Sequence, residues 1–61
     1  MQSAPDFAEA HYNLAGILAR RGRLDEAIAR CQKALEIQPA LDPARQLLAT
    51  LTAARERNHG R

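Results

Sequence analysis

Apolar residues recur every three or four positions along the chain, which is the spacing of one face of an α-helix. In the first such stretch these residues are Ala10, Leu14, Ala15, Ile17 and Leu18. Asp6 and Glu9 have the spacing of a capping box, with Asp in the Ser/Thr role. Gly22 follows two arginines, as expected where a helix stops. The pattern therefore predicts a first helix over residues 7–21.

Two further segments show the same helical spacing. A second helix should begin near Leu24 and end before a proline, because the residue before a proline is pushed out of the α region. Asp42 and Pro43 then restart the pattern as N-cap and first helical residue. The third helix should run to about Arg57, and residues 58–61 should fray as a disordered tail. No segment alternates like a β-strand, so the expected fold is all-α.

The chain also matches itself when it is shifted so that Pro5 falls on Pro39. The same shift pairs Phe7 with Leu41, Ala10 with Ala44, Leu14 with Leu48, Ala15 with Ala49, and Ile17 with Leu51. Most of these positions are apolar and lie at helical spacing. We call this shift the repeat period. A period of this length, roughly 34 residues, is typical of helical repeats that pack on their neighbours.

Eight residues carry a resemblance to the tetratricopeptide repeat (TPR) family, which places large, small and proline residues at fixed positions of two helices. They are His11, Leu14, Ala15, Leu18, Ala27, Cys31, Ala34 and Pro39. The resemblance implies a single domain over residues 1–61. One complete antiparallel helix-turn-helix repeat covers residues 8–41, and a capping helix covers residues 42–57. It also implies a right-handed stack of the type that builds α-α superhelices.

Small residues explain the spacing of the first two helices. Ala15 and Ala27 stand where two antiparallel helices cross, which allows the backbones to approach within the usual distance of roughly 8–10 Å. Larger residues, among them Leu18 and Cys31, would fill the space around them. We therefore expect a bulky residue at position 27 to separate the pair.

The resemblance also implies a ligand, because first helices of stacked TPR repeats line a concave groove that receives peptide segments. The groove-facing residues implied here are Glu9, Tyr12, Asn13, Gly16, Ala19 and Arg20. Residues 8–15 are similar in sequence to repeats of O-linked N-acetylglucosamine transferases. In those repeats, such an Asn contacts the backbone of the bound peptide. Only Asn13 carries this likeness, because Leu47 stands at the equivalent place one repeat later.

Short side chains limit the stability of so small a chain. Its 61 residues include one Phe, one Tyr and no Trp, so the rings that usually dominate burial are few. The third helix has leucines on more than one face. One face can pack on the preceding helix, and the other is expected to be exposed to solvent or to meet a partner. These residues are Leu47, Leu48 and Leu51. Since stacked repeats need neighbours, we predict a homo-oligomer formed through the first or third helix.

Charge and composition give little support to binding of nucleic acid or membrane. The net charge is only +2, and the basic residues 55–61 include no aromatic ring to stack on a base. No apolar run approaches the roughly 18 residues of a membrane span, and the first residues lack the features of a signal peptide. We expect a soluble protein, with the cytoplasm favoured as its compartment.

The residues with reactive side chains form no catalytic or metal-binding pattern. His11 has no second ligand three or four residues away, and Cys31 lies on the apolar stripe of the second helix. Asp25 and Glu26 are adjacent, so they diverge by about 100° on a helix. A glycine-rich phosphate loop is also absent from the sequence. We predict no enzyme activity, no metal and no cofactor.

The leading hypothesis is a protein-interaction module that binds a protein or peptide ligand and self-associates. One alternative is a non-catalytic targeting segment of a larger enzyme, such as a glycosyltransferase. A catalytic domain in the same reading frame would distinguish it. A second alternative is a basic nucleic-acid adaptor, which predicts retention on heparin with steep salt dependence.

Overall fold

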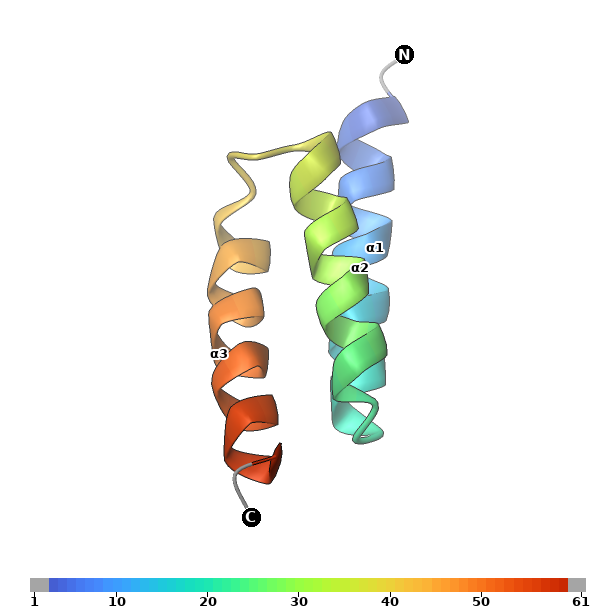
Figure 1. Ribbon diagram of the computed structural model, residues 1–61. Coiled ribbons are helices and arrows are strands. Elements are labelled where there is room, and N and C mark those ends of the chain that lie inside the picture. Colours follow the sequence, from blue (N-terminus) through green and yellow to red (C-terminus); the bar gives the residue numbers. More distant parts are fainter. Residues whose placement is uncertain (1–2, 60–61) are drawn as a thin grey trace.

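The computed structural model describes the backbone of residues 3–59 and the side chains of residues 7–58. This part consists of three helices, α1 (Ser3–Arg20), α2 (Leu24–Ile37) and α3 (Asp42–His59). Figure 1 shows α2 running antiparallel to α1, and α3 antiparallel to α2. α3 lies mainly along α2 and touches α1 in few places. The described residues contain no strand, and the predicted all-α fold is confirmed.

α1 begins at Ser3, well before the predicted start at Phe7. The backbone of Asp6 lies inside the helix instead of capping it, so the predicted capping box with Glu9 is wrong. Pro5 permits the earlier start, because the first amide groups of a helix have no intrahelical partner and proline lacks only such a group.

Gly22 ends α1 as the sequence predicts. Its φ is 82°, in the left-handed region that a glycine enters without a Cβ penalty. The amide of Gly22 donates to the carbonyl of Ala19 at 3.0 Å, and the amide of Arg23 donates to the carbonyl of Leu18 at 2.9 Å. These two bonds form a Schellman motif, which satisfies carbonyl groups at the end of the helix.

The end of α2 follows the proline rule. Gln38 precedes Pro39 and has φ −138° and ψ 89°, outside the α region. Its amide still donates to the carbonyl of Ala34 at 2.8 Å, so the last turn of the helix is closed. The helix therefore ends at Ile37, as the position of the proline predicts.

The start of α3 differs by one residue from the prediction. The amides of Ala44 and Arg45 donate to the carbonyl of Leu41 at 3.1 and 3.2 Å, so Leu41 is the N-cap. Asp42 is the first helical residue and Pro43 the second. The buried side chain of Leu41 fixes the chain at this point. Packing therefore decides the position that capping preference alone placed at Asp42.

The predicted tail is also corrected. α3 continues through Asn58 and His59, while Gly60 and Arg61 lie outside the described residues. The last turns of α3 are held beside the start of α2, where Arg55 Nε lies 3.0 Å from Asp25 Oδ1. This attachment and the absence of a helix breaker before Gly60 explain the longer helix.

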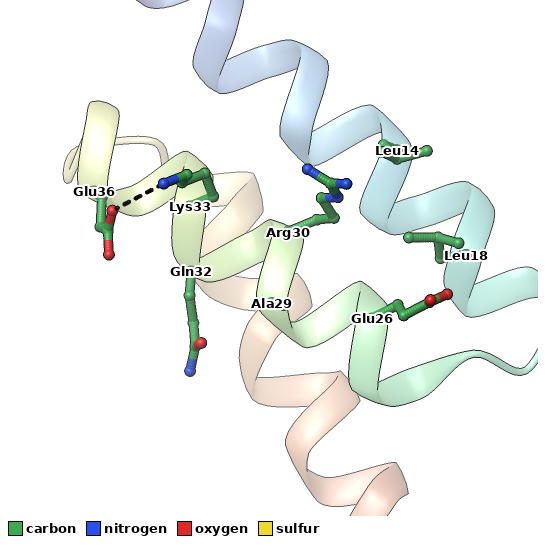
Figure 2. Close-up of a pocket in the computed structure, with 8 residues that line it drawn as sticks. All are labelled: Leu14, Leu18, Glu26, Ala29, Arg30, Gln32, Lys33 and Glu36. Carbon is green, nitrogen blue, oxygen red and sulfur yellow. Dashed lines mark ion pairs between the residues drawn. The ribbon is translucent and has the colours of Figure 1, made fainter.

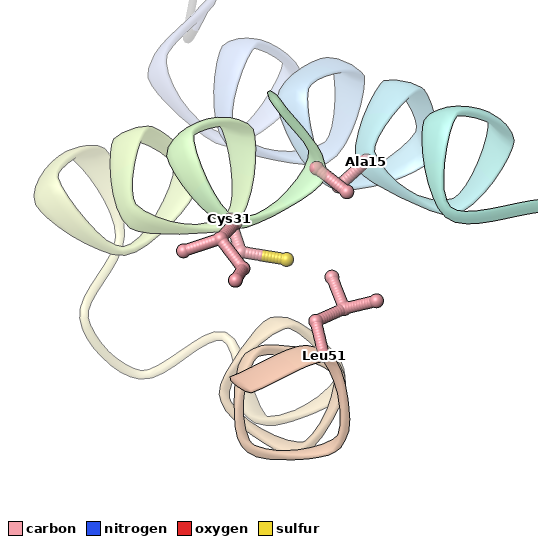
Figure 3. Packing of buried hydrophobic residues seen from close by; sticks show 5 residues of the cluster. Ala15, Cys31 and Leu51 are labelled. Carbon is pink, nitrogen blue, oxygen red and sulfur yellow. The ribbon is translucent and has the colours of Figure 1, made fainter. Parts of the chain in front are cut away.

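Two clusters of buried residues hold the helices together. The first lies where all three helices meet, and Figure 3 shows Ala15, Cys31 and Leu51 converging there from α1, α2 and α3. Ala27 and Ile28 complete it. The second cluster consists of Ala8, Ala34, Leu41 and Ala44. Ala15 and Ala27 are fully buried, as predicted for residues where two helices cross.

The apolar residues of α1 divide between two faces. Ala15 is fully buried and Leu18 packs against the first cluster. Ala10 and Ile17 belong to the same helical pattern but are exposed. Helical periodicity identified the apolar positions of α1, but it did not show that they serve two surfaces.

Candidate functional site

The six residues predicted to face a groove share one side of α1. Three of them, Glu9, Asn13 and Arg20, are exposed. The other three are half-buried, namely Tyr12, Gly16 and Ala19. At about 100° per residue, these six positions cover an arc that is distinct from the buried Ala8 and Ala15. We call this set the groove face of α1.

The half-buried members of the groove face are held by the core. Tyr12 packs against the second cluster, which includes Leu41 and Ala44. Ala19 packs against the first cluster. The Tyr12 ring is therefore supported from beneath while part of it remains open to solvent. An aromatic ring held in this way offers a contact surface at low entropic cost.

Gly16 stands in the middle of the groove face without a packing reason for being glycine. Its φ is not positive, and a Cβ built at this position would meet no atom within 4 Å. A glycine inside a helix costs about 0.5–1 kcal/mol relative to alanine. The described residues therefore give no structural compensation for this cost, and they leave an open space above the helix backbone.

Each residue of the groove face has a sequence equivalent on α3, one repeat period later. Gln46 and Thr50 correspond to Tyr12 and Gly16 and are exposed. Leu47 corresponds to Asn13 and is half-buried. The amide at position 13 is therefore not repeated on α3, as the sequence indicates.

The three leucines predicted to mediate self-association lie against the core of the chain itself. Leu51 is 4% exposed and belongs to the first cluster. Leu47 and Leu48 are half-buried and pack against that same cluster. These positions form one contiguous arc about 100° wide. Leu51 is therefore covered by the chain's own core, whereas Leu47 and Leu48 keep part of their surface exposed.

An open groove between α1 and α2 was missed by sequence reasoning. It has a volume of about 460 Å³, and Figure 2 shows Leu14 and Leu18 on its α1 side and Glu26, Arg30 and other α2 residues opposite. Lys33 Nζ and Glu36 Oε1 of α2 lie 3.8 Å apart at its margin. The signal available in the sequence was Leu14, which belongs to the apolar pattern of the first helix.

The residues considered for chemistry are engaged elsewhere in the structure. Asp25 pairs with Arg55, and Glu26 Oε1 accepts a hydrogen bond from Arg23 Nη1 at 3.1 Å. Cys31 is a buried free thiol, and burial raises its pKa above the ordinary value because the thiolate would be desolvated. Among the described residues, no group of three or more His, Cys, Asp or Glu side chains is arranged to hold a metal ion.

The described helices thus form an antiparallel pair, α1 and α2, followed by α3. The sequence of α3 repeats that of α1 after one repeat period. This arrangement is that of an α-helical repeat protein. A family model described as the tetratricopeptide repeat matches residues 6–59. The chain belongs to the tetratricopeptide repeat family. No curated protein and no solved structure matches it. The match supports the family as a whole and does not support a particular likeness to O-linked N-acetylglucosamine transferases.

Membership in this family indicates a protein-interaction module, since TPR domains generally bind protein partners and are typically non-catalytic scaffolds. Among the described residues, no helix is both long and apolar enough to cross a membrane.

Proposed function

We propose that this chain binds an extended peptide on the groove face of α1. The observation that carries the proposal is Gly16, a mid-helix glycine that internal packing does not require and that leaves open space beside the exposed Asn13. An approaching peptide backbone fits such an opening, because a glycine presents no side chain to exclude it. The cost of the glycine to helix stability is then offset by binding.

The flanking residues supply suitable chemistry for a peptide. The side chain of Asn13 has both hydrogen-bond donors and an acceptor, which match the amide and carbonyl groups of an extended backbone. Tyr12 provides a supported ring beside it. Glu9 and Arg20 place opposite charges toward the two ends of the face. Their separation of about 16 Å along the helix matches roughly five extended peptide residues.

Selection of peptides from a random display library tests this proposal. A selected peptide is measured by fluorescence anisotropy against the unmodified chain, Asn13→Ala and Gly16→Leu. Ala49→Leu, at an exposed position of α3, serves as the control. We expect at least tenfold weaker binding for the two α1 variants and unchanged binding for the control. Failure to select any peptide, or equal binding by all four chains, would contradict the proposal.

We predict separately that the chain self-associates through α1 and not through α3. The position of Leu51 in the first cluster removes the main apolar contact that α3 would need. On α1, Phe7 and Ile17 are exposed. Sedimentation equilibrium over a hundredfold concentration range tests whether the chain forms a homo-oligomer.

The targeting-segment hypothesis is tested by the reading frame of the parent gene, where a catalytic domain is expected.

A further inference from the structure

Four residues of the groove face follow one another in a nearly straight line along α1. Glu9, Asn13, Gly16 and Arg20 are spaced by four, three and four positions. At about 100° per residue, Glu9 and Arg20 differ in direction by only about 20°, because the interval between them is close to three full turns. We call these four residues the axial track of α1. A ligand that lies along this track meets a carboxylate at one end and a guanidinium at the other.

The two end charges of the axial track have no partner of opposite sign among the described side chains. The ion pairs found there include neither Glu9 nor Arg20. The positions three and four residues before and after Glu9 hold no basic residue, and those around Arg20 hold no acidic residue. Both side chains are exposed. Their charges are therefore open to a ligand.

This pair of opposite charges is a property of α1 and is not repeated on α3. One repeat period after Glu9 and Arg20 stand Pro43 and Ala54, which are uncharged. The helix dipole favours Arg20, which lies in the last turn of α1. Its effect fades within the first turn, however, and Glu9 is the seventh residue of the helix. The dipole therefore gives no reason for a carboxylate at position 9.

An extended peptide can reach both charges with two of its own side chains. Alternate residues of an extended chain point to the same side, so its first and fifth residues lie on one side, about 13 Å apart. Glu9 and Arg20 are about 16 Å apart along the axis of α1. The long side chains of the charged residues cover the difference of about 3 Å. The sixth residue of such a peptide would point away from α1.

We propose that the groove face of α1 selects an extended peptide with a basic residue and an acidic residue four positions apart. The basic residue pairs with Glu9 and the acidic residue with Arg20, while the backbone between them passes Asn13 and the open space at Gly16. The proposal rests on the function proposed above and adds the charge pattern of the ligand. Either order of the two charges fits, because an extended peptide can lie along α1 in either direction.

Sublibraries of displayed nine-residue peptides test this charge pattern. Two positions are fixed in each sublibrary and the others are random. The first has Lys and Glu four positions apart, the second two Lys, the third two Glu, and the fourth Lys and Glu five positions apart. All are selected on the full chain, and the tightest peptide of each is measured by fluorescence anisotropy. We expect about fivefold tighter binding from the first sublibrary at low salt, and a smaller preference at high salt, because the pairs are exposed.

Charge-reversal variants assign the preference to the two residues. Arg20→Glu places carboxylates at both ends of the axial track, so this chain should prefer the peptide with two lysines. Glu9→Lys should prefer the peptide with two glutamates. Arg30→Glu is the matched control, because it changes the net charge as Arg20→Glu does, but at an exposed position of α2. It should keep the preference of the unmodified chain. Circular dichroism of each variant checks that helicity is retained.

Four outcomes would overturn the charge pattern alone. They are equal binding from the four sublibraries, a preference for the five-position spacing, the same preference in Arg20→Glu as in Arg30→Glu, and helicity gained by the bound peptide. The last outcome would identify a helical ligand. In each of these cases peptides are still selected, and weaker binding by Asn13→Ala would keep the groove face as their site. Selection of no peptide from any sublibrary would overturn both the charge pattern and the function proposed above.

Discussion

Arg55 Nε lies 3.0 Å from Asp25 Oδ1 and ties the end of α3 to the start of α2. Among the described side chains, the other ion pairs join residues three positions apart in sequence. The position of α3 along α2 is therefore set by apolar packing together with this one charged pair, Arg55–Asp25, among the described side chains.

We expect this pair to contribute little to global stability. Arg55 and Asp25 side chains are 47% and 79% exposed, so solvent and salt screen their attraction. Arg55→Ala should lower the free energy of unfolding by about 0.5 kcal/mol at low salt, and by less at high salt. Urea unfolding at two salt concentrations measures this, with Gln32→Ala at an exposed, uncharged position of α2 as a control. A loss that does not change with salt would instead assign the effect to packing of the Arg55 stem.

The fold could be predicted from the sequence because its signals are local. Gly22 and Pro39 mark helix ends through backbone geometry that any neighbouring structure must respect. Helix starts were predicted less well, since Ser3 begins α1 and Leu41 caps α3 for reasons of packing and proline tolerance. Capping preferences amount to about 1 kcal/mol, and burial of one leucine outweighs them.

The surfaces were harder to predict than the helices. Periodicity grouped Ala10 and Ile17 with Ala15, although they face different directions in the structure. It also assigned Leu51 to an interface between chains, whereas it lies in the core of this one. A pattern of apolar positions shows that a surface must be covered, but which element covers it depends on the arrangement of all three helices.

Two glycine substitutions should change stability in opposite directions. Gly16→Ala should stabilise the chain by about 0.5–1 kcal/mol, because the added Cβ meets open space and the helix gains propensity. Gly22→Ala should destabilise it by about 1–2 kcal/mol, because its φ of 82° is strained for a residue with a Cβ. Thermal unfolding of the two variants measures both effects. A destabilised Gly16→Ala chain would show that the helix is packed more tightly at this point than the structure indicates.

A tryptophan at position 27 should prevent the first two helices from packing. Ala27 is fully buried in the first cluster together with Ala15, so a larger side chain has no space. Overpacking costs about 1–3 kcal/mol and sometimes more, which is enough to unfold a small domain. Far-UV circular dichroism should show lost helicity for Ala27→Trp and retained helicity for Ala29→Trp, at an exposed position of α2. Equal melting curves for the two variants would contradict the assigned register.

The substitution Leu51→Glu should unfold the chain instead of changing its assembly. Leu51 is almost fully buried against Ala15 and Cys31, so a carboxylate there would lose its hydration without gaining a partner. We expect reduced helicity at every protein concentration, whereas Ala53→Glu on the exposed side of α3 should leave helicity unchanged. A Leu51→Glu chain that keeps its helicity but has a lower molecular mass would instead place Leu51 between chains.

Alkaline pH should weaken the fold through Cys31. Burial raises the pKa of its thiol above the ordinary value of 9.0, whereas in the unfolded chain the thiol ionises near that value. Ionisation therefore favours the unfolded state, so the stabilising contribution is complete below about pH 9 and is lost as the pH rises through the raised folded-state pKa. Urea unfolding at about pH 7 and pH 10.5 measures the loss. Cys31→Ala removes the thiol while the other titrating groups remain, so its stability should fall less over the same interval; an identical fall in both chains would assign the effect to those other groups.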